Sequence, residues 1–514
     1  MEEQQNVPWR DPVTNKPLEV LPTGRQELVL ASLSILFSVL QVNFLLWGDM
    51  NLGFALATIA VTATNMIYLL RSGAKPTFYS AALLCLSMVI VAGCAWTDQS
   101  ELKMKICMFL SIVTNLGLCL LAGKNTRDPG SVASLIDAPL TFFTLGFGKM
   151  DAAGRGLRAG FRAGGSASRK FGSLMVGLLI AIPLMGVLIA LLTSADAAFE
   201  ALLSKLPKFN WFEWIISLIF GGFLGMILYS RTVALCHGAL KKPEKHPWKG
   251  VPALTLNTTL IAVCLVYVVY LLSQMAYFVG GFAGLLPENY TVAEYARRGF
   301  FEIAWICGIN LGILALSMGL LPREQKLPAV TRIAGVFLGL VTVFLICTEA
   351  AKMSMYIGSF GLTPLRVLTM VFLLWLGITM ILVCARLFVK FPYMKTVVTV
   401  ALILAAGVIW VDVDARVAQY NVTAYQSGTL DTVDVDYLGQ LSAGAVPYLE
   451  ALTHDSDPAV AEDAKEVLRT YGDQDDLFEG GALVGDIREW NYAAAKADEI
   501  LEPYRTQEAA DNNK

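Results

Sequence analysis

Charged residues are scarce in this chain: only 16% of its 514 residues are Asp, Glu, Lys or Arg, whereas 55% are apolar. In ordinary soluble domains about a quarter of the residues are charged, so the shortage excludes that class of protein. The mean hydropathy of +0.57 agrees with this. The composition therefore predicts an all-α integral membrane protein, because helices satisfy their own backbone hydrogen bonds inside a bilayer.

Histidine is also nearly missing. The three histidines (His237, His246 and His454) are scattered, and no HExxH motif, GxSxG motif or Walker phosphate loop occurs. These absences argue against an enzyme. The sequence predicts no catalytic residue, no cofactor and no metal site.

None of the nine cysteines forms a CxxC pair, and none lies beyond Cys384. All of them fall within or beside apolar runs, which predicts packing side chains, not disulfides or metal ligands. Basic residues flank the apolar runs instead of collecting on a soluble domain, so no nucleic-acid partner is predicted. Residues 1–27 are polar and proline-rich, so we expect no cleaved signal peptide and assign the first apolar run as the anchor.

Eleven apolar runs are long enough to cross a lipid bilayer, because a crossing helix needs about 20 residues. The lipid bilayer is therefore the first predicted partner of the chain. The runs occupy residues 28–47, 52–70, 78–96, 103–122, 172–193, 212–235, 253–279, 300–321, 329–351, 364–389 and 394–411. The sixth run contains Gly221, Gly222 and Gly225, which favour close packing against another helix.

Lys and Arg are distributed unequally between alternate connections. The connections on one side, starting with residues 1–27, hold 24 of them, and those on the other side hold 8. This bias predicts a cytoplasmic N-terminus in the cell membrane, and eleven crossings then put the C-terminus outside the cytoplasm. Residues 28–122 contain the first four spans and residues 172–411 the other seven. The segment 123–171 between them is interpreted as an interfacial stretch with a basic topogenic loop, with a lipid-binding basic surface as the alternative.

The composition reverses after Val411. Residues 412–514 contain 7 Lys/Arg against 22 Asp/Glu, whereas the preceding part contains 32 against 20. We predict a small extracytoplasmic helical domain over 412–506 that leans on the membrane helices, because it has few large apolar residues, and a disordered end over 507–514. Its helices are expected at 434–452, 456–471 and 486–504. The acidic surface makes this domain a candidate binding site for an extracytoplasmic protein partner.

A charged segment lies between the seventh and eighth runs. Thr291 and Glu294 form a capping box that begins a helix, and Glu294, Arg298 and Glu302 follow at four-residue intervals on one face, with Arg297 beside them. Unpaired charges are costly at the membrane boundary, so ion pairing is the first interpretation. An anion site or a pore gate is the second.

The same threading places further polar residues on the outer side, namely Glu349, Lys352, Tyr356 and Arg366. Glu349 and Lys352 are three residues apart on one helix, so a local salt bridge is the first interpretation of this pair. The alternative, which we carry as the functional hypothesis, is that these residues converge into an outer polar vestibule. Its residues are Glu294, Arg297, Arg298, Glu302, Glu349, Lys352, Tyr356 and Arg366. The expected lid consists of Asp414, Arg416, Asp434 and Asp436. The pairs Asp412/Asp414 and Asp434/Asp436 lack EF-hand spacing, so solvation beside the membrane is favoured over calcium binding.

Three separated segments resemble a known family. They are TVAEYARRGFFE at 291–302, YIGSFGLTPLR at 356–366, and VDARVAQYN at 413–421 paired with DVDYL at 434–438. They are similar to a bacterial multi-pass membrane family catalogued as "domain of unknown function 4173", related to the 4153 group. The resemblance implies a membrane topology and no established activity.

Two kinds of function fit these observations. A non-enzymatic envelope or sensory scaffold would bind a partner through the vestibule and the acidic domain. A small-solute transporter or channel is the alternative, and it would show repeated interrupted spans. The sequence has no internal repeat, which favours the scaffold.

Overall fold

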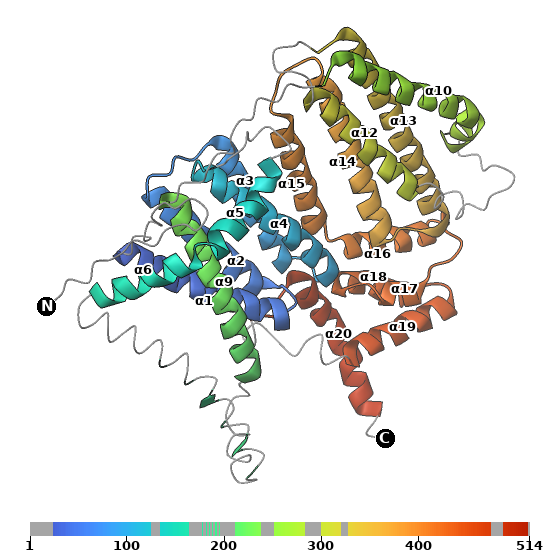
Figure 1. Cartoon of the computed structure of the whole chain (residues 1–514). Coiled ribbons are helices and arrows are strands. Elements are labelled where there is room, and N and C mark those ends of the chain that lie inside the picture. Colours follow the sequence, from blue (N-terminus) through green and yellow to red (C-terminus); the bar gives the residue numbers. More distant parts are fainter. Residues whose placement is uncertain are drawn as a thin grey trace.

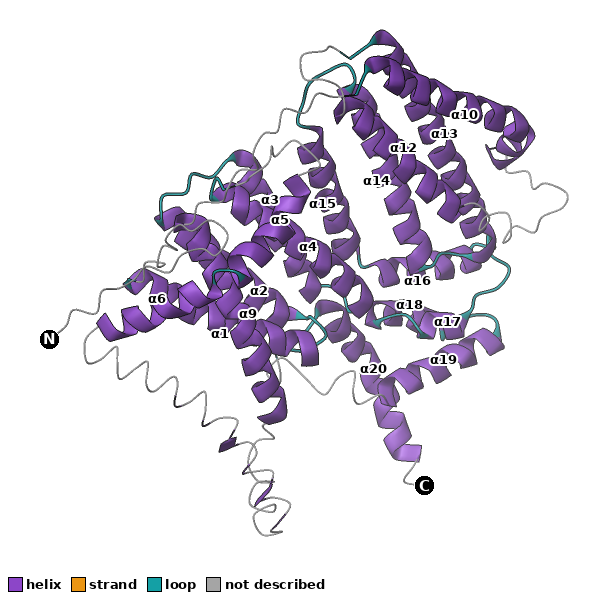
Figure 2. Ribbon diagram, in the orientation of Figure 1, coloured by secondary structure: helices purple, strands orange, loops and turns teal. Residues whose placement is uncertain are grey.

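The computed structural model describes residues 24–124, 134–163, 211–237, 251–282, 300–319, 327–473 and 487–511, with a few single residues between 177 and 195. The described residues form helices and their connections, with no strand among them (Figure 2). Nine of the described helices are long and apolar enough to cross a membrane. The fold class is therefore an all-α multi-pass membrane protein, as the composition predicted.

Nine of the eleven predicted spans correspond to these nine helices. The predicted span 300–321 forms helix α12 (Phe300–Gly319), but its apolar part, Glu302–Met318, is shorter than the others. The predicted span 172–193 lies almost entirely outside the described residues. The count of eleven crossings therefore stays a prediction.

Five long helices form the first bundle (Figure 1). They are α1 (Arg25–Trp47), α2 (Leu52–Arg71), α3 (Phe78–Ala92) with the 3₁₀ turn η1 (Gly93–Ala95), α4 (Ser100–Leu121) and α9 (Trp211–His237). Helix α1 packs against both α2 and α9. A Cβ on Gly225 would stand 2.6 Å from the Cα of Ile35, and Gly221 approaches Val39 in the same way, whereas Gly222 meets open space. The predicted close packing is confirmed for two of the three glycines.

A short helix α5 (Ser134–Thr141), a π-helical turn η2 (Phe142–Phe147) and helix α6 (Met150–Ala163) follow α4. The sequence indicated an interfacial stretch here. The structure packs α5 and η2 against α4 and α9. Ala138 and Leu145 are buried, and Ser230 donates a hydrogen bond to the Leu145 carbonyl at 3.2 Å. This stretch is therefore part of the first bundle.

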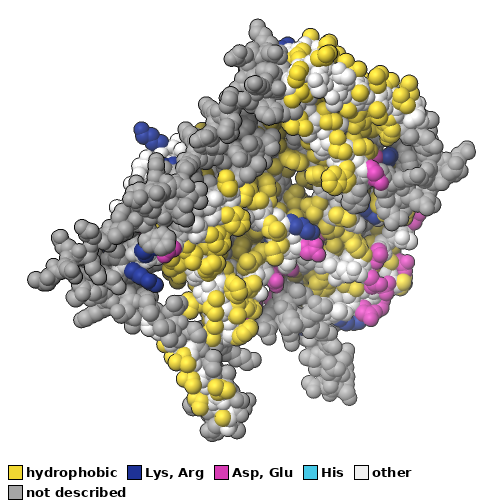
Figure 3. All heavy atoms as spheres, in the orientation of Figure 1, with side chains coloured by type: hydrophobic (Ala, Val, Ile, Leu, Met, Phe, Trp, Pro, Cys, Tyr) yellow, Lys and Arg dark blue, Asp and Glu magenta, His cyan; other side chains and the backbone are white. Residues whose placement is uncertain are grey.

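The second bundle consists of α10 (Ala253–Phe282), α12, α13 (Ala329–Phe360) and α14 (Pro364–Arg386). A polar chain crosses it: Tyr267 donates to Asn310 at 2.9 Å, and Asn310 donates to Thr342 at 2.9 Å. Helix α15 (Tyr393–Val411) packs against both α14 and α3, so it joins the two bundles (Figure 1). Apolar side chains cover much of both bundles on the face drawn in Figure 3, as expected of a lipid-facing surface.

The C-terminal helices lie across one end of the bundles (Figure 1). They are α16 (Val413–Gln426), α17 (Val435–Gly439), η3 (Ala443–Ala445), α18 (Val446–Leu452), α19 (Pro458–Asp473) and α20 (Tyr492–Asp511). Their buried residues Leu449, Leu468 and Leu501 share one apolar cluster with Leu102 and Leu402 of the membrane helices. The C-terminal helices therefore lean on the membrane part, which makes up for their few large apolar residues.

The helix boundaries here differ from the expectation. The sequence did not predict α16, which begins where Asp412 adopts a left-handed backbone (φ 54°) and its carboxylate accepts the Ala415 N–H at 3.5 Å. The predicted helix 434–452 is broken into α17, η3 and α18, because Pro447 in the first turn of α18 starts a new helix. Helix α20 continues to Asp511, where the sequence indicated disorder from residue 507.

Candidate functional site

Residues 487–493 attach the C-terminal helices to the first bundle. The N–H groups of Leu52 and Gly53 donate to the carbonyls of Trp490 and Ile487 at 3.1 and 2.9 Å. These N–H groups open helix α2 and would otherwise lack an intrahelical partner. Arg488 forms an ion pair with Glu213 of α9 at 2.8 Å. The end of the chain thus caps one membrane helix and is tied to a second.

A buried polar cluster lies where the connections between membrane helices meet the C-terminal helices. We call it the polar junction, and it consists of Asn51, Asp98, Lys103, Asp412, Asp414 and Asn491. Lys103, in the first turn of α4, is 0% exposed. Its ammonium group donates to the Asp49 carbonyl at 3.3 Å and to the side-chain oxygen of Asn51. A buried ammonium needs such acceptors, because leaving water without them costs several kcal/mol.

The carboxylates of the polar junction are held by donors from distant segments. Asn491 donates to Asp98 at 2.9 Å, and the Ala443 N–H reaches the other oxygen of Asp98 at 3.4 Å. Gln99 donates to Asp414 at 2.7 Å, while the Ser442 N–H donates to its second oxygen at 3.0 Å. Each carboxylate therefore links a membrane helix end to the C-terminal helices.

Burial dominates the electrostatics of these acids. It raises the pKa of Asp412 to about 6, partly offset by the Ala415 N–H and Thr97. It also raises the pKa of the Asp98 carboxyl, which Lys103 counteracts, and the pKa of Asp414, which Ser442 and Gln99 counteract. Desolvation penalises the charged form of an acid, so all three shifts have the same physical origin.

A cavity of about 500 Å³ opens between the α13–α14 corner and the C-terminal helices. We call it the Arg366 cavity. Arg366 lies over the Tyr356 ring at 4.0 Å, and its Nη1 donates to the carbonyls of Phe360, at 3.0 Å, and Gly361. Within the described residues the other guanidinium donors have no acceptor. Such donors suit a planar carboxylate or a phosphate.

Asn421 of α16 fixes the wall of the Arg366 cavity. Its side chain accepts from the Leu362 N–H at 2.6 Å and donates to the Leu362 carbonyl at 2.9 Å. Gly361 has a φ of 73°, and a Cβ there would stand only 2.5 Å from the Asn421 amide oxygen. Glycine is thus required at this position both for its backbone conformation and for the approach of Asn421.

The opposite wall of the cavity comes from residues 430–437. Asp431 and Asp434 are exposed there, and Asp434 caps α17 by accepting the Tyr437 N–H at 2.8 Å. Burial raises the pKa of Tyr437 to about 12, so its hydroxyl stays protonated at neutral pH and can donate. The cavity therefore combines one guanidinium with acidic and hydroxyl groups.

The structure brings together part of the predicted vestibule. Glu349 is 2% exposed and accepts from Lys352 at 2.6 Å, and Tyr356 follows one turn later on α13, beside Arg366. Glu302, at the start of α12, is exposed. The remaining three residues, Glu294, Arg297 and Arg298, lie outside the described part of the chain.

The expected lid residues separate. Asp434 lines the Arg366 cavity, whereas Asp414 is buried in the polar junction. Asp436 lines a second cavity of about 440 Å³ that also contains Asp98 and Glu466. Arg416 is exposed and donates to Gln419 at 2.7 Å, in a shallow cavity of its own. The four residues therefore do not line one cavity as a single lid, because Asp414 and Arg416 belong to α16, whereas Asp434 and Asp436 belong to the start of α17.

Among the described residues, no group of three or more His, Cys, Asp and Glu side chains is placed to hold a metal ion. Asp412 and Asp414 are engaged by hydrogen-bond donors, namely Thr97 at 3.2 Å and Gln99 at 2.7 Å. The arrangement suits recognition of a polar group and the joining of two parts of the chain.

The fold and these cavities define a multi-pass membrane protein whose C-terminal helices, α16 to α20, lie across one end of its bundles. We call these helices the platform. Residues 78–452 match the model of the family described as "Domain of unknown function (DUF4153)", so the chain belongs to that family. The match contains the polar junction apart from Asn51 and Asn491, and it contains the whole Arg366 cavity. Comparison with curated proteins and with solved structures gave no match in either case.

Sequence reasoning missed the polar junction. Lys103 is the first residue of the predicted span 103–122, and Asp98 lies in the connection before it, so neither was singled out. The sequence contained one signal of this cluster. Thr97, Asp98 and Gln99 are polar residues directly between two apolar runs. Asp49 and Asn51 occupy the short turn between the first two runs in the same way. The sequence does not indicate that these residues lie next to Asp412 and Asn491, which are hundreds of residues away.

Proposed function

We propose that this protein is a non-enzymatic scaffold or sensor of the cell membrane that binds a partner at the Arg366 cavity. One observation carries the proposal: residues of separated segments with family-like motifs, 356–366, 413–421 and 434–438, line the same cavity. Helix packing alone would not require Arg366 to lie in this cavity with guanidinium donors that have no acceptor among the described residues.

The placement on the outer side rests on charge. The threefold excess of Lys and Arg on alternate connections supports a cytoplasmic N-terminus and an extracytoplasmic platform in the plasma membrane. The three motifs also support a more specific assignment than the family match, namely to the bacterial group catalogued as domain of unknown function 4173.

The chemistry of the platform indicates the kind of partner. Residues 412–514 carry 22 Asp/Glu against 7 Lys/Arg. On the drawn face of Figure 3, acidic side chains gather over the region of α17 and α19. A protein with a basic surface that presents a carboxylate to Arg366 would complement both features.

The test compares two arginine variants of the full-length protein, purified in mild detergent with whatever co-purifies. Arg366→Gln should weaken partner recovery about tenfold or more, because charge-assisted hydrogen bonds are lost. Arg416→Gln removes an exposed arginine outside the cavity and should leave recovery unchanged. Equal recovery with both variants, at equal thermal stability, would refute the role of the cavity.

A small-solute transporter or channel is the second candidate, because the first bundle contains a cavity of about 360 Å³ with polar side chains among its lining residues. Thermal stabilisation of the isolated protein by a solute would support transport. A partner protein whose recovery depends on Arg366 would support the scaffold.

A further inference from the structure

Arg231 is a buried cation inside the first bundle. It belongs to α9 and is 1% exposed, and its Nε and Nη2 atoms have no hydrogen-bond partner among the residues that the structure describes. In the sequence it lies near the end of the sixth apolar run, 212–235, and its charge was counted with the connection that follows. An unpaired guanidinium in such a place is costly, so the site calls for an anion.

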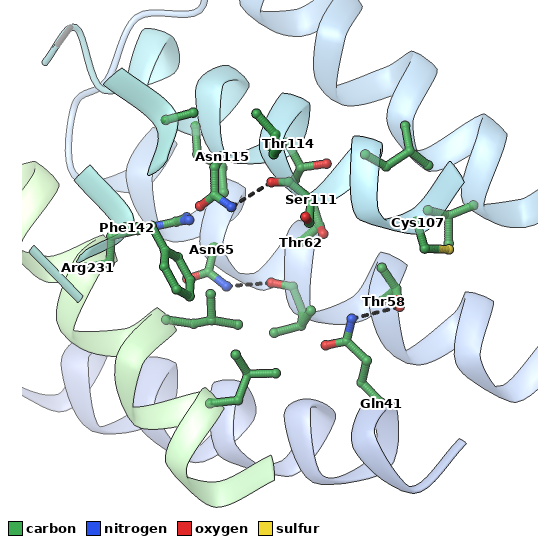
Figure 4. Close-up of a pocket in the computed structure, with 18 of the residues that line it drawn as sticks. Gln41, Thr58, Thr62, Asn65, Cys107, Ser111, Thr114, Asn115, Phe142 and Arg231 are labelled. Carbon is green, nitrogen blue, oxygen red and sulfur yellow. Dashed lines mark hydrogen bonds between the residues drawn. The ribbon is translucent and has the colours of Figure 1, made fainter. Parts of the chain in front are cut away.

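The guanidinium lies at one end of a cavity of about 360 Å³ (Figure 4). Asn65 of α2 and Asn115 of α4 lie at the same end in that view, and Gln41, Thr58 and Cys107 lie toward the other. The side-chain oxygen of Asn115 is also buried and accepts no hydrogen bond from the described part of the chain. None of the described residues that line this cavity is Asp or Glu, so this part of the chain offers no carboxylate to Arg231.

The rest of the lining is mostly apolar. It includes Phe54, Val91, Leu110 and Phe142. Two further lining residues, Ile112 of α4 and Phe143 of η2, are 47% and 61% exposed, so the cavity reaches the surface of the bundle beside them. In a multi-pass membrane protein such a surface faces hydrocarbon, and a ligand entering here comes from the bilayer.

The depth of the charged end fits a lipid headgroup. Arg231, Asn65 and Asn115 each lie six residues before the last residue of their helices, His237, Arg71 and Leu121. At a rise of 1.5 Å per residue this is about 9 Å from the helix ends. The charged end of the cavity therefore lies nearer the membrane surface than the bilayer centre.

We propose that this cavity binds a lipid with an anionic oxyanion headgroup, a phosphate or a carboxylate, which pairs with Arg231 while an acyl chain occupies the apolar part. The inference does not depend on the Arg366 cavity, since the two sites lie in different bundles. A lipid-stabilised first bundle would make the whole protein sensitive to membrane composition.

The experiment measures thermal unfolding of the full-length protein, delipidated in detergent, as phosphatidylglycerol, phosphatidylcholine or inorganic phosphate is added. Phosphatidylglycerol should raise the unfolding temperature, and the other two should not. In Arg231→Gln the half-maximal lipid concentration should rise about tenfold or more, because a charge-assisted pair is lost. Arg386→Gln is the matched control, since it removes an arginine from the end of a helix in the second bundle.

Three outcomes would overturn the proposal. One is an identical response of wild type and Arg231→Gln, and another is equal stabilisation by phosphatidylcholine. The third is an equal rise with inorganic phosphate, which would assign the anion to the aqueous phase. If Arg231→Gln does not fold, Asn115→Leu keeps the arginine and alters its surroundings. That variant should also weaken the phosphatidylglycerol response, and an unchanged response would count against the site.

Discussion

At the residue scale, Asp412 combines three roles. It ends α15, turns the chain through a left-handed backbone and caps α16, while Thr97 donates to its carboxylate. A Cβ on Gly444 would stand 2.7 Å from this carboxylate, so the surrounding chain closes over it. Burial of this kind explains why its pKa rises to about 6.

This shift predicts a pH dependence of stability. Between an unfolded pKa near 4 and the folded value, the folded protein holds a proton that the unfolded chain has released, so stability falls as pH rises through this interval, by at most about 3 kcal/mol. Thermal unfolding should therefore occur at a higher temperature at about pH 5 than at about pH 7.5. The pKa values of Asp98 and Asp414 are raised in the same direction, and the charge of Lys103 partly offsets the shift of Asp98.

Asp412→Asn tests the assignment. Asparagine keeps an acceptor for the Ala415 N–H and cannot ionise, so the variant should show a smaller difference in unfolding temperature between the two pH values. Asp455→Asn is the control, because Asp455 lies in an exposed turn, where it accepts the Asp457 N–H at 2.9 Å. A pH response of Asp412→Asn equal to that of wild type would contradict the assignment.

At the element scale, α9 and α1 depend on glycine for their contact. Gly225→Ala would place a methyl group against the Ile35 backbone, and Gly222→Ala would place one in open space in the same helix. The first change should destabilise the protein by about 1–3 kcal/mol through overpacking, while the second should be close to neutral. Unfolding temperatures of the two variants check this, and equal values would show that α1 can shift at no cost.

The elements of the platform follow a different rule from the spans. Helices α17, η3 and α18 are short, and their apolar residues Leu438, Ala445 and Leu449 are buried in the core shared with the membrane helices. Elements this short have little intrinsic stability, so their tertiary contacts hold them. That explains why one long helix was predicted where three short ones form.

At the scale of the whole molecule, the threading decides which compartment the platform faces. Reporter fusions at the C-terminus and at residue 150 test it. A reporter at residue 150 should be active only if it works in the cytoplasm, because four predicted spans separate it from a cytoplasmic N-terminus. A reporter at the C-terminus should be active only if it works outside the cytoplasm, because seven further predicted spans follow residue 150. A C-terminal fusion active only in the cytoplasm would place the Arg366 cavity inside the cell.

The sequence alone determined the fold class and most of the spans. Apolar runs of sufficient length are local features, and so are the glycines of α9, because a bilayer imposes its requirement on each segment separately. Tyr356 and Arg366, which form a cation–π contact, also lie within one family-like segment of eleven residues, 356–366.

Only the tertiary structure decided the rest. The polar junction joins Lys103 and Asp98 to Asp412 and Asn491, and the first bundle buries Arg231 where its position in the sequence indicated a flanking charge. These features depend on which helix ends lie side by side and on how α15 connects the two bundles. Contacts over such separations leave no periodic signal in the chain, because they are set by the packing of whole helices and not by the neighbours of each residue.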